Sequence, residues 1–167
     1  MARSLWGAEL EAEFEEFVAG AWPRLRHAGW LLSHDSHEAE DLAQAALARA
    51  YANWGRVTRD GAYSYVHRSL VNGYIDSVRR RRPVPVAQTG DTAVAGDEAS
   101  VDDRSQLSEV LAELSPRERS IIVWRYYLDA PESEVARQLG VSVGTVKSTA
   151  SRALARVRSA HIASGKD

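Results

Sequence analysis

Apolar residues recur at intervals of three and four along most of this chain, and this spacing constrains its fold more than any other feature. In the first part of the chain these residues are Leu10, Phe14, Phe17, Val18, Leu25, Ala28, Leu31 and Leu32. Such spacing places apolar side chains on one face of an α-helix. No segment shows the two-residue alternation that is typical of a half-buried strand. The sequence therefore predicts an all-α protein.

One segment, residues 83–104, interrupts the helical pattern. Its sequence, "PVPVAQTGDTAVAGDEASVDDR", contains two prolines, two glycines and many small residues, and it shows no sustained period. This composition is typical of a linker. The segment has five acidic residues and one basic residue, so we expect it to stay extended. The sequence thus predicts two small helical domains, 10–82 and 105–163, joined by a flexible acidic linker.

Start and stop signals subdivide the first domain into three helices. Pro23 is predicted to break or kink the first of them. Asp35 and Glu38 have the spacing of a capping box, which would open a second helix that reaches about Trp54. A third helix is expected to stop before Pro83. It contains Gly73, whose helix-propensity cost of about 1 kcal/mol relative to Ala suggests a close approach of another element.

The second domain ends in a helix-turn-helix pattern. Ser115, Pro116 and Glu118 form a strong helix start. Further on, "PESEVARQLG" predicts a short helix that ends at Gly140, and Ser142 is placed to cap a last helix that reaches about Ala160. The apolar residues predicted to pack these two helices together are Val135, Ala136, Leu139, Val141, Val146 and Ala150.

The last helix is basic and contains no acidic residue. Its exposed face is predicted to carry Thr145, Lys147, Ser148, Ser151 and Arg152. A recognition helix reads base edges with residues near its N-terminus, and its N-terminus also favours phosphate. Arg156 and Arg158 lie further along, at positions suited to backbone phosphates. The alternative interpretation of this motif alone is an amphipathic helix with a solvated basic face.

Composition limits the classes of protein to consider. The 167 residues carry a net charge of −2, but residues 55–82 contain seven basic and two acidic residues, which is typical of a surface for a polyanion. There is no cysteine, which excludes disulfides and cysteine-based zinc sites. We identify no signal peptide and no membrane segment. A cytoplasmic protein without a cofactor is the expectation.

The ordered motifs resemble those of a known family. The segment "LSPRERSIIVWRYYLDAPESEVARQLGVSVGTVKSTASRALARVR" closely resembles region 4 of bacterial sigma factors, notably the extracytoplasmic-function (ECF) group of the sigma-70 family. "EAEDLAQAALARAYANW" is similar to their region 2.2, and "YVHRSLVNGYIDSVRRRR" to their regions 2.3 and 2.4. The resemblance implies a non-enzymatic factor that binds core RNA polymerase, recognises promoter −10 and −35 elements and directs transcription initiation.

The resemblance also implies roles for particular residues. Asp41 and Gln44 match residues that bind the β′ coiled coil of core polymerase, and region 4 is expected to bind the β flap. An anti-sigma factor is a further possible partner. The residues that match −10 element contacts are Arg68, Asn72, Asp76, Arg79, Arg80, Arg81 and Arg82. The residues that match −35 element contacts are Thr145, Lys147, Ser148, Ser151, Arg152 and Arg156. The family usually has a basic residue where this chain has Val71.

The sequence also has two alternative interpretations. A stand-alone dimeric helix-turn-helix regulator would explain the basic last helix, but it gives no account of residues 36–82. A metal-dependent hydrolase would use the polar cluster around His34, Asp35 and His37. These side chains straddle a predicted helix start and are expected to point in different directions, which disfavours a metal site. Trp54, Tyr63 and Tyr65 are candidates for stacking on unpaired bases, although core packing is the favoured role for Trp54.

Overall fold

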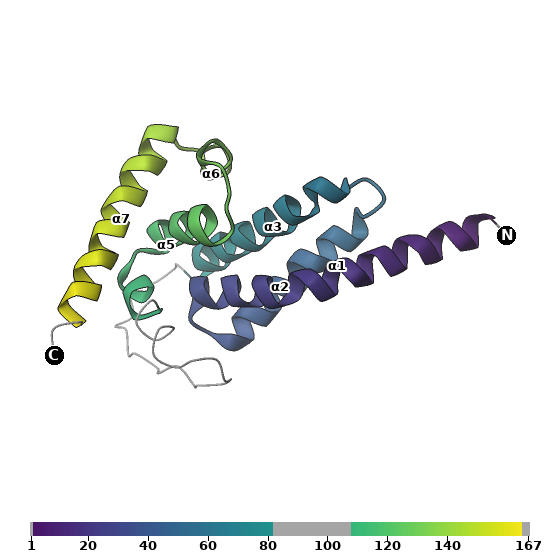
Figure 1. The fold of residues 1–167 in the computed structure, drawn as a ribbon, viewed down its shortest axis with the longest axis horizontal. Helices are drawn as coiled ribbons and strands as arrows, with labels where there is room; N and C mark the ends of the chain where they lie inside the picture. The colour runs from purple at the N-terminus through teal and green to yellow at the C-terminus, as the bar shows by residue number, and fades with distance from the viewer. Residues whose placement is uncertain (1, 82–107, 165–167) are drawn as a thin grey trace.

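The computed structural model describes residues 2–81 and 108–164, and all regular secondary structure in them is helical (Figure 1). This confirms the predicted all-α class. The elements are α1 (Ala2–Ser33), α2 (Ser36–Ala52), α3 (Arg59–Arg80), α5 (Pro116–Ile122), the π-helix η1 (Val123–Tyr127), α6 (Glu132–Leu139) and α7 (Val143–Ser164). Residues 108–113 form a further helical turn before α5. The predicted linker 83–104 and Arg82 lie outside the described residues.

The first half of the molecule is a bundle of α1, α2 and α3, with the N-terminal part of α1 extending beyond the other two helices (Figure 1). The spacing seen in the sequence predicts its core well. Leu25 and Leu32 of α1 are fully buried, as are Val66 and Leu70 of α3. No described helix combines the length and the hydropathy that crossing a membrane requires.

Helix α1 continues through Pro23, so the predicted break at this residue is wrong. A proline inside a helix removes one backbone hydrogen bond and displaces the preceding turn. Pro23 lies on the exposed side of α1, where water can satisfy the freed carbonyl group. Its neighbours Ala21 and Leu25 are buried against the bundle, and this burial holds the helix together on both sides of the proline.

Helix α2 begins as predicted, but its cap is only half of a capping box. The Asp35 side chain accepts a hydrogen bond from the Glu38 backbone N–H at 2.9 Å. The Glu38 carboxylate does not return to residue 35. It accepts from Ser77 Oγ at 2.6 Å and pairs with Arg81 at 2.6 Å. Glu38 therefore joins the start of α2 to the end of α3.

Gly73 lies where two helices approach closely, as predicted. A Cβ atom at this position would stand 3.3 Å from Cδ2 of Leu42 on α2. A larger residue would push α3 away from α2. The residue thus sets the separation of the two helices that carry Asp41, Gln44 and Asn72.

The second half begins with the predicted capping box. Glu118 N–H donates to Ser115 Oγ at 3.2 Å, and Ser115 N–H donates to the Glu118 carboxylate at 3.0 Å. Pro116 occupies the first helical turn. Helix α5 then passes directly into the π-helical segment η1, in which Trp124 is buried. This π-helical segment was not predicted from the sequence.

Helices α6 and α7 form the predicted helix-turn-helix. Gly140 ends α6 in the left-handed region, with a φ of 66°, where glycine has no steric penalty. Ser142 Oγ then accepts from the Thr145 N–H at 3.0 Å and caps α7. Val135, Ala136, Val146 and Ala150 are buried between the helices.

The two halves pack against each other. Helix α5 lies on α3, and η1 lies on α1 (Figure 1). Their buried apolar side chains form one continuous cluster that includes Leu25 and Leu70 from the first half and Ile121 and Trp124 from the second. The residues predicted to bind DNA therefore lie in a molecule whose two helical units are closely associated.

Candidate nucleic-acid interface

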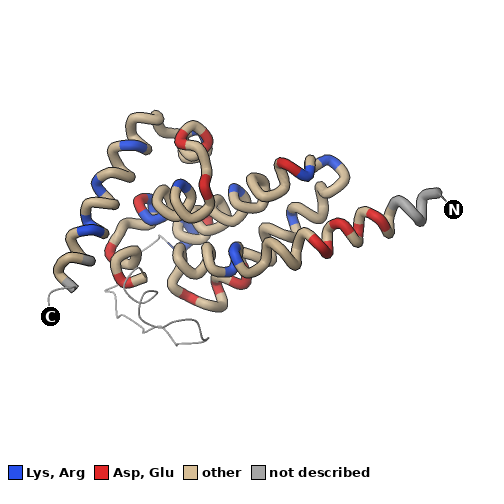
Figure 2. The backbone as a smooth tube through the Cα atoms, viewed as in Figure 1, with Lys and Arg blue, Asp and Glu red and all other residues tan. Residues whose placement is uncertain are grey.

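Helix α7 presents an exposed basic face. All six residues predicted to contact the −35 element are exposed on this helix. Figure 2 shows Lys and Arg at several turns of α7 and no acidic residue along it. The opposite face packs against α5 and α6 through Val146, Ala150 and Ala153, which are buried. The polar side chains therefore share the exposed side of α7.

Local hydrogen bonds order the N-terminal part of this face. Thr145 Oγ1 lies 2.9 Å from Ser142 Oγ, and Ser148 Oγ donates to the Thr145 carbonyl at 3.2 Å. Arg152 Nε donates to the Ser148 carbonyl at 3.3 Å. Lys147 is paired with Glu132 of α6 at 3.6 Å. An exposed pair of this kind contributes little free energy, so a phosphate or a base can displace it.

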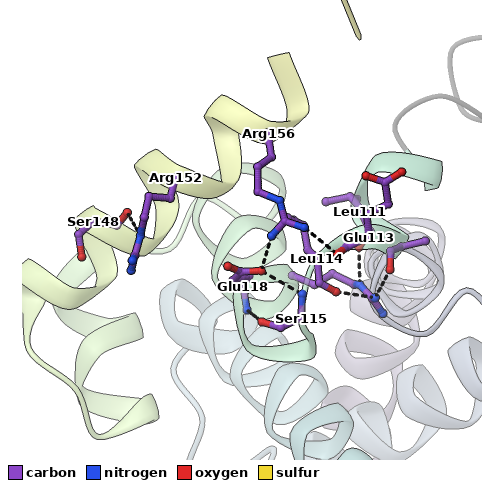
Figure 3. A network of polar contacts seen from close by, with 10 residues as sticks. Leu111, Glu113, Leu114, Ser115, Glu118, Ser148, Arg152 and Arg156 are labelled. Atoms are coloured by element: carbon purple, nitrogen blue, oxygen red, sulfur yellow. Dashed lines mark hydrogen bonds and ion pairs between the residues drawn. The ribbon is translucent and has the colours of Figure 1, made fainter. Parts of the chain in front are cut away.

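Arg156 differs from the other predicted contacts because it is bound within the protein (Figure 3). Its guanidinium pairs with the Glu118 carboxylate at 3.1 Å and donates to the Glu113 carbonyl at 2.9 Å. These bonds fasten α7 to the start of α5. The structure thus gives Arg156 a part in holding α7 in place, whereas the nearby Arg158 is exposed.

A second row of predicted contacts runs along α3. Arg68, Asn72, Asp76 and Arg79 follow one another at helical intervals and share one face of the helix. The Arg68 guanidinium lies 5.7 Å from the Tyr65 ring centroid, and Asp76 is 4.0 Å from Arg79. Asn72 is half-buried, and its Nδ2 lies 3.5 Å from Oε1 of Gln138 on α6.

The arginines at the end of α3 differ in their surroundings. Arg79 and Arg80 are exposed, whereas Arg81 pairs with Glu38. Side-chain hydrogen bonding to Glu38 raises the pKa of Arg81. Val71, which stands where the family usually has a basic residue, is fully buried. A basic side chain at that position would have to leave the core.

Asp41 and Gln44 are both exposed on α2, one turn apart. They share a face of the helix that the bundle leaves open. Asp41 borders a shallow surface hollow of about 490 Å³ together with Asp35, His37, Glu38 and Arg81. In the described part of the chain, no three His, Asp or Glu side chains are grouped as a metal ion would need.

The aromatic residues near the basic segment pack mainly within the protein. The Trp54 ring is 5.0 Å from the rings of both Phe14 and Phe17, which supports the core interpretation. Tyr63 packs on Phe17 with a centroid distance of 4.9 Å but remains 46% exposed. The Tyr65 hydroxyl accepts from Asn53 at 3.2 Å.

Two histidines at the junction of the halves, His34 and His67, have lowered pKa values. The pKa of His67 is lowered to about 4, chiefly by burial and then by the charge of Arg24, against an opposing effect of Asp129. Burial also lowers the pKa of His34, against the opposing effect of a 2.8 Å hydrogen bond that its ring Nε2–H donates to the Ser108 carbonyl. Burial raises the pKa of Tyr74 on α3.

Several residues with defined roles carry no signal in the sequence. Arg119 contacts both halves of the molecule, and Arg24 reaches from α1 to the turn after η1. A single arginine on a predicted helix is ordinarily a solvated surface residue. The groups that Arg119 and Arg24 reach in the other half, among them the carbonyls of Leu32 and Tyr127, are distant in sequence, so the one-dimensional pattern does not reveal them.

Two segments of the chain match family models. Residues 21–84 match Sigma-70 region 2, and residues 104–157 match Sigma-70, region 4. The RNA polymerase sigma-E factor of Streptomyces avermitilis is 38% identical over 149 residues, which are 87% of this chain and 83% of that protein. The ECF RNA polymerase sigma factor SigM of Mycobacterium tuberculosis is 33% identical over 146 residues, covering 86% and 74% of the two chains. The chain belongs to the ECF group of the sigma-70 family.

Solved structures agree with the fold of this sigma factor. The sigma factor RpoE from Bartonella quintana, determined in complex with the anti-sigma factor NepR, superimposes with a TM-score of 0.69 at 23% identity. The match covers 89% of this chain and 96% of RpoE. CnrH in complex with the cytosolic domain of CnrY gives a TM-score of 0.63 at 18% identity, over 92% and 90% of the two chains. As a sigma factor, the protein binds core RNA polymerase and directs transcription initiation at promoters.

Proposed function

We propose that this sigma factor reads the −35 element with α7 and the −10 element with α3, and binds core RNA polymerase through α2. The observation that carries the proposal is the exposed face of α7. It joins hydroxyl, lysine and arginine side chains on one side of a helix that has no carboxylate, while the helix-turn-helix core fixes the other side.

On α7 we assign base reading to the residues near the helix start. Lys147 and Arg152 can each donate to guanine, and Thr145, Ser148 and Ser151 have hydroxyls that suit several bases. Recognition helices contact base edges with this part of the helix. Arg158 lies about four turns from the start and is assigned to backbone phosphate.

On α3 we assign Asn72 to an unpaired base of the melted −10 element, and Arg68, Arg79 and Arg80 to phosphates around it. A base that leaves the stack needs new hydrogen-bond and stacking partners. The amide of Asn72 supplies the first, and the half-buried Tyr65 ring, two turns earlier on the same face of α3, is proposed for the second. Asp76, Arg81 and Arg82 complete the proposed −10 surface.

We assign Asp41 and Gln44 to the β′ coiled coil of core polymerase and the second half of the chain to the β flap. The functional units are 10–82 and 105–163. Polymerase works in the cytoplasm, which is the proposed location. The factor itself is proposed to catalyse no reaction. The structure of RpoE contains an anti-sigma factor, so a partner of this kind is also proposed here.

The polymerase contact can be tested by single substitutions. Asp41→Ala and Gln44→Ala remove exposed side chains and should leave the free energy of unfolding within about 0.5 kcal/mol of wild type. At an interface the same changes can cost 1 kcal/mol or more. We therefore expect affinity for core polymerase, measured by titration of a labelled factor, to fall by about fivefold or more.

Glu15→Ala is the matched control, because Glu15 is an exposed acidic residue on α1. It should bind polymerase as wild type does. Equal affinity of all three variants would show that α2 is not the contact surface. If the wild-type chain bound no polymerase and instead dimerised on duplex DNA, the stand-alone regulator would replace the proposal.

A further inference from the structure

Glu132, in the first turn of α6, lies between two cations from different elements. One of its carboxylate oxygens is 3.6 Å from Arg125 of η1, and the other is 3.6 Å from Lys147 of α7. The Glu132 side chain is 32% exposed, whereas that of Lys147 is 63% exposed. The three residues thus form a chain of charges that runs from a mostly buried arginine to the proposed base-reading face.

Arg125 fixes the position of the Glu132 carboxylate from the protein side. Its guanidinium donates to the Ala130 carbonyl at 2.8 Å and lies 5.3 Å from the centre of the Tyr126 ring. These contacts hold the arginine in one place, and Glu132 lies against it on a short side chain. In the pair with Lys147, Glu132 is therefore the anchored member, and the long lysine side chain is the one that adjusts.

Glu132 and Lys147 border a surface hollow of about 210 Å³ beside α7. Arg158, Ser151 and Tyr126 line the same hollow. Without the carboxylate, two cations and two hydroxyl-bearing side chains would suit a backbone phosphate. Glu132 places a negative charge there, and like charges at short distance repel. A guanine edge offers the acceptors O6 and N7, which carry no net charge, so the carboxylate excludes phosphate more strongly than a base.

We propose that Glu132 is a positioning residue that directs Lys147 to a base and away from phosphate. This role rests on the proposed function, because it takes Lys147 as a −35 contact. A lysine ammonium has three donors. One of them stays on Glu132, and two remain for O6 and N7 of a guanine in the major groove. An unsupported lysine is a mobile point charge that a phosphate captures in any sequence, whereas a supported one is held for a single contact.

Glu132→Ala should change two properties of the holoenzyme. Selection of promoter fragments from a randomised −35 element should show that preference at the base contacted by Lys147 falls by about three- to tenfold. Titration of a fragment with a scrambled −35 element should show higher affinity than in wild type. The slope of log affinity against log salt concentration should steepen by up to about one, because the released lysine gains a phosphate.

Glu132→Gln separates charge from hydrogen bonding. It keeps an acceptor oxygen but removes the negative charge, so it should steepen the salt dependence as Glu132→Ala does and lose less of the base preference. Circular dichroism identifies a variant that has lost its helices, and the glutamine variant keeps the test valid if the alanine variant does not fold.

Glu134→Ala is the matched control. Glu134 is also acidic and lies in the first turn of α6, so its loss removes the same charge from the same helix end. It is not part of the chain from Arg125 to Lys147. This variant should keep the wild-type preference and salt slope. The double variant of Glu132→Ala and Lys147→Ala should be as selective at that base as Lys147→Ala alone, because Glu132 acts through Lys147.

Wild-type preference and salt slope in folded Glu132 variants would overturn the proposal, even if Lys147→Ala still alters the preference. Lower affinity for all sequences with an unchanged preference would also overturn it, because a merely structural role of Glu132 gives that result. If Lys147→Ala itself leaves the preference unchanged, the proposed function of Lys147 fails, and the role of Glu132 falls with it.

Discussion

Arg152 and Arg158 lie on the same helix, but we expect Arg152 to contact a base and Arg158 to contact a backbone phosphate. Arg152 is near the start of α7, and loss of a bidentate base contact costs about 1–3 kcal/mol at one base position. Loss of a phosphate contact weakens all sequences alike and reduces the salt dependence of binding. Arg152→Ala should therefore relax the preference at one or two bases of the −35 element, whereas Arg158→Ala should not.

Selection of active promoters from a randomised −35 element, for wild type and each variant, measures this difference. Lys147→Ala should behave like Arg152→Ala. Identical preference profiles for wild type, Lys147→Ala and Arg152→Ala would remove these two residues from base reading while leaving the family assignment intact.

His67 should make stability depend on pH. Its folded-state pKa of about 4 lies below the ordinary value of 6.5, so the unfolded state binds the proton more readily. The stabilisation is complete above pH 6.5 and is lost as the pH falls toward 4. Between about pH 7.5 and about pH 5 this group alone should reduce the free energy of unfolding by about 2 kcal/mol. The charged groups that face it are Arg24 on α1 and Asp129 after η1.

Urea unfolding of wild type and His67→Leu over that pH range tests this prediction. The slope against pH should be shallower in the variant, whatever offset its packing adds. His37→Gln, at an exposed histidine, should keep the wild-type slope. Parallel curves for wild type and His67→Leu would show that His67 does not titrate as stated.

Residue identity predicted the exposed face of α7. It did not predict which side chains of that face are bound by other residues of the protein. Thr145, Lys147 and Arg152 were identifiable because they fall opposite an apolar stripe. Arg156 has the same character, yet it binds Glu118 and the Glu113 carbonyl. That choice depends on where α5 begins in space, and the pattern along α7 contains no such information.

Among the elements, the start of α5 combines a local cap with a contact from α7. Ser115→Ala should lower the free energy of unfolding by about 1 kcal/mol, because the Glu118 N–H loses its partner. In a chain of this size that is a decrease of about 2–4 °C in Tm. Thermal unfolding measures it. Ser159→Ala removes an exposed serine inside α7 and should shift Tm far less. An unchanged Tm for Ser115→Ala would mean that the cap is not stabilising.

Helix starts and ends were predicted well where their signals are local. The caps at Asp35, Ser115 and Ser142 and the left-handed Gly140 each involve residues within four positions. The continuation of α1 through Pro23 and the π-helical segment η1 depend on packing against other elements. Propensity is a weak guide in such cases because burial overrides it.

For the whole molecule, the sequence predicted two helical units but not how they associate. The bonds that join them link residues 87 and 103 positions apart, from Arg119 to Leu32 and from Arg24 to Tyr127. Contacts between residues so far apart in sequence do not appear in the periodicity of the apolar residues. The basic segment 55–82 and the basic last helix predicted two basic surfaces, and the structure has Lys and Arg along α7 and at the end of α3 (Figure 2).

The central claim is that this chain gives core RNA polymerase its choice of promoter. The most direct measurement is transcription in vitro by core polymerase from the same organism on a library of genomic fragments, with and without the protein, followed by mapping of 5′ ends. The account predicts a set of start sites that appears only with the protein, preceded by shared −35 and −10 sequences. Start sites that remain at background at saturating protein would contradict it.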